Sequence, residues 1–108
     1  MSRMNKIEDL LQKEIAKIII CKIDNPDIKN TVTITGIKVS RDLRSSIVYF
    51  TTLLDNHAFL EDKMNSIKPV IKHHLSKSVY LKRIPDIKFI YDDTQMKGEK
   101  INKILENL

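Results

Sequence analysis

Residues 57–91 read HAFLEDKMNSIKPVIKHHLSKSVYLKRIPDIKFIY, and their pattern indicates two helices followed by a strand. Apolar side chains recur at helical spacing on both sides of Pro69, which stands in the middle of the pattern. Proline has no backbone N–H, so an α-helix accepts it only in the first turn or bends there. The stretch therefore predicts two helices joined by a kink at Pro69. Pro85 then precedes a short alternating segment, which predicts a strand over residues 87–91.

The residues before this stretch predict one helix and two strands. Residues 4–23 repeat apolar side chains every three or four positions, as the inner face of an amphipathic helix does. Residues 31–39 and 45–54 alternate instead, and the short polar turn between them predicts an antiparallel hairpin with a bulge at Gly36. Beyond the third strand, a last helix is predicted to start at Thr94.

The predicted order is α-β-β-α-α-β followed by a C-terminal helix. This order indicates an α+β protein in which helices back a three-stranded sheet. The chain has 108 residues, of which 42% are hydrophobic and 31% are charged. That balance is typical of a globular protein, and we expect residues 1–108 to form a single domain.

Three features of the sequence predict a soluble cytoplasmic protein. Charged residues occupy the N-terminus, where a signal peptide would have its apolar segment. No apolar run approaches the roughly 20 residues that span a membrane. The single cysteine, Cys21, excludes an internal disulfide framework and fits a reducing compartment. Because Cys21 stands among isoleucines, it is predicted to be a small core residue and not a nucleophile.

Basic residues are concentrated in one part of the chain. No acidic residue occurs between Asp62 and Asp86, whereas this interval holds five lysines and one arginine. The net charge of the chain is +5, so the residues outside the interval sum to −1. Local basicity of this kind is typical of a surface that binds a polyanion. The alternative is an inert, solvated helix face rich in lysine.

The sequence offers no set of side chains for catalysis or for a metal. His73 and His74 are adjacent and diverge by about 100° on a helix, so they do not hold one metal together. Motifs of phosphate-binding loops, dinucleotide-binding folds and serine nucleophiles are missing. Asp92 and Asp93 are typical of a helix N-terminus, where negative charge is favourable. The sequence therefore predicts neither an enzyme nor a cofactor.

Four of the six aromatic residues stand on predicted strands. Phe50 and Phe89 are predicted to pack in the core, because a small protein needs large apolar side chains there. Tyr49 and Tyr91 fit either of two roles, core packing or stacking on nucleic-acid bases. The sequence leaves both roles open.

The element order is that of the type II KH domain, in which a helix-turn-helix binds the backbone of single-stranded nucleic acid. The sequence also resembles the ribosome-binding factor A family of bacterial assembly factors for the small ribosomal subunit. The residues that carry this resemblance run along the chain in the family's order: Arg3, Glu14-Ile15, Asn25-Pro26, Val32-Thr33-Ile34-Thr35, Val39-Ser40, Asp42-Leu43, Val48-Tyr49, Ile71-Lys72, Leu75, Leu81, Pro85, Ile87, Phe89 and Asp92.

Two positions depart from the family pattern. Ile67-Lys68-Pro69 stands where the family has Ala-x-Gly, and Asn25-Pro26-Asp27 stands where it has Asp-Pro-Arg. A proline still breaks the helix, but it does not give the close approach to a phosphate that a glycine allows. At the second position, Asp27 stands in place of the family's arginine, so one positive charge is lost there.

The resemblance implies a non-catalytic factor that binds the 30S subunit and its 16S rRNA and assists late rRNA processing and maturation. It implies a monomer without a membrane anchor, a small-molecule substrate or a cofactor. RNA contact is predicted first for residues in and after the kinked helix pair: Lys68, Lys72, His73, Lys77, Lys82 and Arg83. A second set extends the surface: Arg3, Lys6, Arg41 and Arg44. The rival function is a basic interaction module that binds an acidic protein partner.

Overall fold

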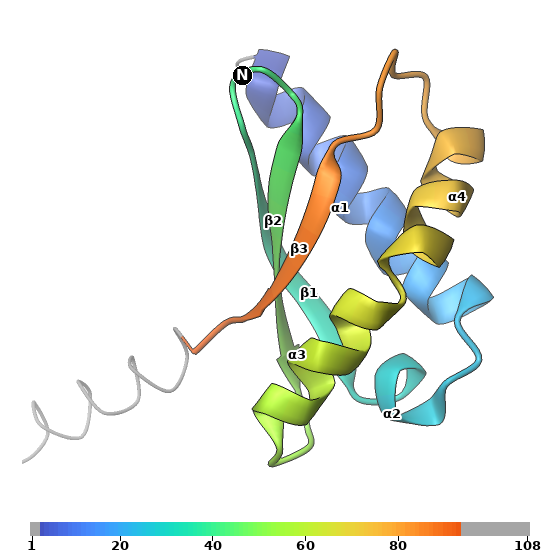
Figure 1. Ribbon diagram of the computed structural model, residues 1–108, viewed down its shortest axis with the longest axis vertical. Helices are drawn as coiled ribbons and strands as arrows, with labels where there is room; N and C mark the ends of the chain where they lie inside the picture. The colour runs from blue at the N-terminus through green and yellow to red at the C-terminus, as the bar shows by residue number, and fades with distance from the viewer. Residues whose placement is uncertain (1–2, 94–108) are drawn as a thin grey trace, which may run out of the picture.

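The computed structural model describes residues 3–93, which form four helices and three strands (Figure 1). In chain order these are α1 (Arg3–Lys22), α2 (Pro26–Lys29), β1 (Val32–Val39), β2 (Ser45–Thr52), α3 (His57–Ser66), α4 (Lys68–Ser78) and β3 (Asp86–Tyr91). Apart from the short helix α2, this is the predicted order α-β-β-α-α-β. The helix predicted from Thr94 lies outside the described residues.

The three strands form one mixed sheet in the order β1-β2-β3. Strands β1 and β2 pair antiparallel, and their register shifts between Ile34 and Gly36. The predicted hairpin and its bulge are therefore confirmed. Strands β2 and β3 pair parallel. A parallel pair needs a long crossover connection, which α3 and α4 provide here.

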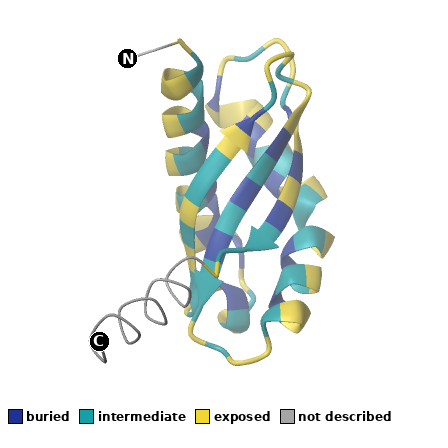
Figure 2. Ribbon diagram, turned by 90° about the vertical axis from the view of Figure 1, so that its left-hand side faces the viewer, coloured by how far each residue is buried: buried dark blue, intermediate teal, exposed yellow. Residues whose placement is uncertain are grey.

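One apolar core lies between the helices and a single face of the sheet. Val48, Phe50 and Phe89 are fully buried on the strands, which confirms core packing for both phenylalanines. The helices contribute buried side chains from α1, α3 and α4: Leu11, Ile15, Ile18, Ile19, Leu60, Met64, Ile71 and Leu75. Figure 2 looks onto the opposite face of the sheet, which none of the described helices covers.

The kink predicted at Pro69 is present as a break between α3 and α4. Ile67 lies between the two helices, and its φ of −94° and ψ of 6° depart from helical values. Because α4 begins at Lys68, Pro69 stands in its first turn, where a backbone N–H is not needed. The apolar spacing after Pro69 predicts that Ile71 and Leu75 face the core, and both are buried.

Helix α2 is an element that the sequence did not predict. The N–H of Asp27 donates to Asn25 Oδ1 (2.9 Å), and Pro26 occupies the first turn. Ile28 is fully buried and anchors this turn to the core. Four residues are too few to show helical periodicity, so the segment reads only as the end of the preceding helix.

The helical patterns of the sequence place Leu10 and Ser78, like Cys21, on inner faces, but all three side chains are exposed. Leu10 is 41% exposed, and Cys21 and Ser78 also lie at the surface. Cys21 is two positions after the buried Ile19 and therefore points about 200° away from it around the helix. The core prediction for Cys21 is wrong because isoleucines nearby in sequence do not fix the direction in which a residue points around the helix.

Candidate nucleic-acid interface

One end of the molecule gathers basic residues from three separate parts of the chain. The N-terminus of α1, the β1–β2 turn and the α4–β3 loop all reach this end, at the top of Figure 1. The N–H of Asp86 donates to the Arg44 carbonyl (2.9 Å), which ties the turn to the start of β3. Six predicted contact residues are exposed on these segments, and we call them the basic end: Arg3, Lys6, Arg41, Arg44, Lys82 and Arg83.

Carboxylates close to the basic end bind groups of the protein itself. Asp42 Oδ1 accepts hydrogen bonds from the Ser40 hydroxyl (2.7 Å) and the Arg44 N–H (3.1 Å). These bonds, that from Ser40 first, hold the pKa of Asp42 below its usual value. Glu8 Oε2 accepts from the Val39 N–H (2.8 Å). Neither arginine of the turn forms an ion pair with another described residue, so both guanidinium groups are accessible to an anion.

A groove of about 480 Å³ lies between α1 and the β1–β2 turn. Arg3 and Arg41 line it together with the apolar side chains of Met4, Ile7 and Leu43. Planar guanidinium groups bind phosphate oxygens and also stack on flat rings, and apolar side chains support such rings. The groove therefore combines the chemical groups that a nucleotide requires.

A second basic group surrounds Asp86 at the junction of α4 and β3. Lys72 Nζ lies 2.7 Å from Asp86 Oδ1. The pKa of Asp86 is lowered first by this hydrogen bond and then by the charges of Lys72, Arg83 and Lys68. In the sequence, Asp86 ends the interval that has no acidic residue. In the fold, however, its carboxylate lies beside α4, within reach of Lys72. Lys72 is therefore partly neutralised, and it is a weaker candidate for phosphate contact than the sequence predicts.

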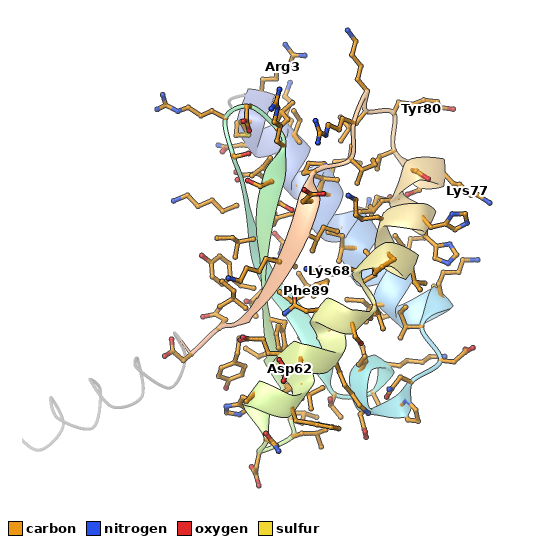
Figure 3. The ribbon with its side chains drawn as sticks, viewed as in Figure 1. Arg3, Asp62, Lys68, Lys77, Tyr80 and Phe89 are labelled. Atoms are coloured by element: carbon orange, nitrogen blue, oxygen red, sulfur yellow. The ribbon has the colours of Figure 1, made fainter. Side chains whose placement is uncertain are left out.

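Lys77 lies on a different face of α4 from Lys68 and Lys72. Lys68 and Lys72 are four residues apart and share a face, whereas Lys77 is five residues further on and lies about 140° around the helix. In Figure 3, Lys77 points away from the body of the protein, whereas the charge of Lys68 acts on Asp86 of β3. His73 is exposed on the same helix. The predicted residues of α4 therefore do not form one patch.

Lys77 belongs to a groove of about 280 Å³ between α1 and α4. Lys17, Lys22 and His74 line the same groove, with Glu14 as a carboxylate. The sequence prediction missed Lys17 and Lys22 as possible contacts. Both stand on the polar side of α1, and only the packing of α1 against α4 brings them beside Lys77.

Tyr91 and Tyr49, whose roles the sequence left open, lie in different surroundings. The Tyr91 ring stacks on His57, with centroids 3.8 Å apart and planes 15° apart, and it meets Phe50 edge-on. Tyr91 is therefore part of the packing. Tyr49 is half-buried on the face of the sheet that α1, α2, α3 and α4 leave open.

Two further observations concern residues 3–93. No three His, Cys, Asp or Glu side chains come together there in a way that could hold a metal ion. Every helix in this range is too short or too polar to cross a membrane.

The sequence matches the family model for ribosome-binding factor A over residues 3–105. Ribosome-binding factor A of Buchnera aphidicola (subsp. Acyrthosiphon pisum, strain Tuc7) is 36% identical over 111 residues, which cover 99% of this chain and 93% of that protein. The Legionella pneumophila (strain Lens) protein of the same name is 28% identical over 106 residues, covering 98% of this chain and 86% of that protein.

The fold is similar to solved structures of proteins with that name. The crystal structure of ribosome-binding factor A from Thermus thermophilus superposes with a TM-score of 0.74 at 17% identity, covering 83% of this chain and 97% of that chain. Coordinates of the Thermus thermophilus factor fitted into a cryo-EM map of a 30S complex give a TM-score of 0.68 at 17% identity, covering 82% and 93%. These matches confirm the predicted KH-like α+β fold.

The family match spans nearly the whole chain, and the Buchnera relative exceeds 30% identity over nearly its full length. The residues that carry the resemblance in sequence also occupy the expected elements of the fold. The chain therefore belongs to the ribosome-binding factor A family.

Proposed function

We propose that this protein binds the 30S small ribosomal subunit and its 16S rRNA and acts as a non-catalytic factor in late rRNA processing and maturation. The observation that carries this proposal is family membership, because the Thermus thermophilus member has been fitted into a map of a 30S complex. We further propose that residues 1–108 act as a single RNA-binding domain, as a cytoplasmic monomer without a cofactor or a small-molecule substrate.

The basic end is the primary contact surface in this proposal. Its six cations are exposed on three segments, and two neighbouring carboxylates, Glu8 and Asp42, accept hydrogen bonds from the protein's own donors. Each phosphate that a lysine or arginine neutralises releases condensed counterions, which favours binding. Lys68 on one face of α4, and His73 and Lys77 on another, are separate secondary contacts. Lys72 contributes less because it already pairs with Asp86.

An acidic protein partner is the rival explanation for the same surface. RNA binding and protein binding differ in what competes for the site. If purified 16S rRNA displaces the protein from subunits, the basic end meets RNA. If the rRNA fails to compete and a ribosomal protein cross-links to the basic end, the rival is correct.

Two charge-matched double variants test the proposed surface. Lys82→Ala with Arg83→Ala removes two cations of the basic end, whereas Lys13→Ala with Lys29→Ala removes two exposed lysines elsewhere. Binding to 30S subunits is measured over a series of salt concentrations. The first pair is expected to flatten the slope of log affinity against log salt by about 1.4 to 1.8, and the second pair to change it little. If both double variants lose the same affinity for 30S subunits, binding depends on the overall positive charge of the protein, and the basic end is not the binding site.

A further inference from the structure

The open face of the sheet carries a row of residues that crosses all three strands. Lys38 of β1 is paired with Ile47 of β2, which is paired in turn with Lys88 of β3. Both lysines are exposed and lie two strands apart, so their Cα atoms are separated by about 10 Å. This row and three serines of the hairpin line a hollow of about 430 Å³.

Tyr49 stands in the next row on the same face, two residues along β2 from Ile47 and therefore about 7 Å from it. Its cross-strand partners are Gly36 and Ile90. A Cβ atom at Gly36 would lie 4.0 Å from the Tyr49 ring, so the ring packs over a position without a side chain. Tyr49 thus presents a half-buried aromatic ring beside the hollow.

The charge of this face favours an anion. Neither Lys38 nor Lys88 forms an ion pair or a side-chain hydrogen bond with another described residue. The carboxylates at the two ends of β3 are already engaged: Asp86 pairs with Lys72 (2.7 Å), and Asp92 accepts from the Thr35 hydroxyl (2.7 Å). The cationic groups in the middle of the face are therefore accessible.

An unpaired nucleotide matches this combination of groups better than an acidic peptide does. Bases stack on aromatic rings, and phosphates bind to lysines. A carboxylate-rich peptide would use the lysines but would leave the ring without a flat partner. The hairpin also joins this face to Arg41 and Arg44 of the basic end, so the two surfaces are continuous.

We propose that the open face of the sheet is a second RNA-binding surface, on which Tyr49 stacks against an unpaired base while Lys38 and Lys88 contact phosphates of the same strand. This inference rests on the proposed function and adds a ligand to it, namely single-stranded RNA. It also assigns a role to a face that none of the helices within residues 3–93 covers.

The test uses a fluorescein-labelled RNA of eight uridines and fluorescence anisotropy with the full-length protein. Tyr49→Ile keeps strand propensity but removes the ring, and it is expected to weaken binding roughly 5- to 100-fold. Tyr49→Phe keeps the ring and is expected to bind like the wild type. The matched control is Phe59→Ile, which removes a 46% exposed ring from α3 and is expected to have no effect.

A second pair of variants tests the lysines without touching the ring. Lys38→Gln with Lys88→Gln is expected to lower the salt slope by about 1.4, as two lost phosphate contacts would. The charge-matched control is Lys13→Gln with Lys29→Gln, both exposed on other parts of the surface. If Tyr49→Ile lowers the melting temperature too far for use, this lysine pair decides the outcome, because both side chains are exposed.

The outcomes separate this inference from the proposed function. Unchanged RNA affinity in Tyr49→Ile and in the lysine pair would overturn the inference, while normal binding to 30S subunits would leave the function intact. If Tyr49→Ile and the lysine pair lose RNA affinity while the wild-type protein does not bind 30S subunits, the inference is supported and the proposed function is refuted. If Tyr49→Ile weakens subunit binding but not binding to the RNA, the face meets a ribosomal protein and the inference is wrong.

Discussion

Replacing Asn65 by alanine is expected to destabilise the protein strongly, although this side chain is only partly buried. Strand β3 is an edge strand of the sheet, and Asn65 binds both backbone groups of Phe89 on its free side. The Phe89 N–H donates to Asn65 Oδ1 (2.9 Å), and Asn65 Nδ2 donates to the Phe89 carbonyl (3.0 Å). The same Nδ2 donates to the Glu61 carbonyl of α3 (2.9 Å). One amide therefore fastens α3 to the sheet.

The size of the effect follows from these two bonds to Phe89. Each contributes a net stabilisation of about 1 kcal/mol, and a backbone group left without a partner adds a penalty of similar size. Water reaches part of the strand edge and offsets part of that penalty. We therefore expect the free energy of unfolding to fall by about 2–3 kcal/mol. For a protein of this size, that loss lowers the melting temperature by roughly 10–20 °C.

Urea and thermal denaturation, followed by circular dichroism, measure this loss. Hydrogen exchange at the Phe89 amide gives a local readout and is expected to accelerate in the variant. The control is Ser66→Ala, one residue further along α3, where an exposed hydroxyl donates to the Lys63 carbonyl (2.6 Å). Its effect is expected to stay within about 0.5 kcal/mol. An equally small loss for Asn65→Ala would show that its two bonds to Phe89 contribute little to holding α3 against β3, which a further bond from the Tyr91 N–H to Glu61 Oε2 (2.9 Å) also joins.

Three other perturbations have definite expected results. Leu75→Ala should cost about 2–5 kcal/mol in urea denaturation by opening a core cavity, and exposed Lys77→Ala should leave the midpoint unchanged. The lowered pKa of Asp86 means that its pairing with Lys72 stabilises the fold above the unfolded pKa of about 3.9, and this stabilisation is lost as pH falls through the folded pKa. The melting temperature of Asp86→Asn should therefore approach that of the wild type on acidification, and a constant gap from pH 7 to pH 2 would contradict this role. Gly36→Ala should shift the melting temperature by only a few degrees, because Gly36 lacks a positive φ and its added Cβ has room; loss of folding would show that the bulge requires glycine.

Local signals in the sequence were sufficient to predict most of the fold. Pro69 marks the helix break because its ring and its missing N–H act on its immediate neighbours. Gly36 marks the bulge in the same way, within a strand whose alternation is otherwise regular. These features act over a few residues, so a linear reading detects them. The exposure of Cys21 depends on the direction in which it points around α1. The isoleucines next to it in sequence do not determine that direction, so the core prediction was wrong.

The arrangement of charges was much less predictable, since it depends on contacts between distant segments. The pairing of Lys72 with Asp86 joins residues 14 positions apart. The basic end brings the N-terminus of α1, the β1–β2 turn and the α4–β3 loop together at one end of the molecule. No pattern in the sequence encodes that proximity. The sequence therefore identified basic residues correctly as a class but did not predict which of them form one surface.

The parallel pairing of β2 with β3 sets the order in which the protein can fold. The β1–β2 hairpin closes over a short turn, whereas the bond from the Ser46 hydroxyl to the Asp86 carbonyl (2.9 Å) spans 40 residues. Closing so long a loop costs chain entropy, and the stabilising contacts between β2 and β3 form only after the loop has closed. Docking of β3 is therefore the expected slow step, and a ribosome making this chain releases β3 after every other described element. Until then, the nascent chain exposes the unpaired edge of β2, where another unfinished chain can attach.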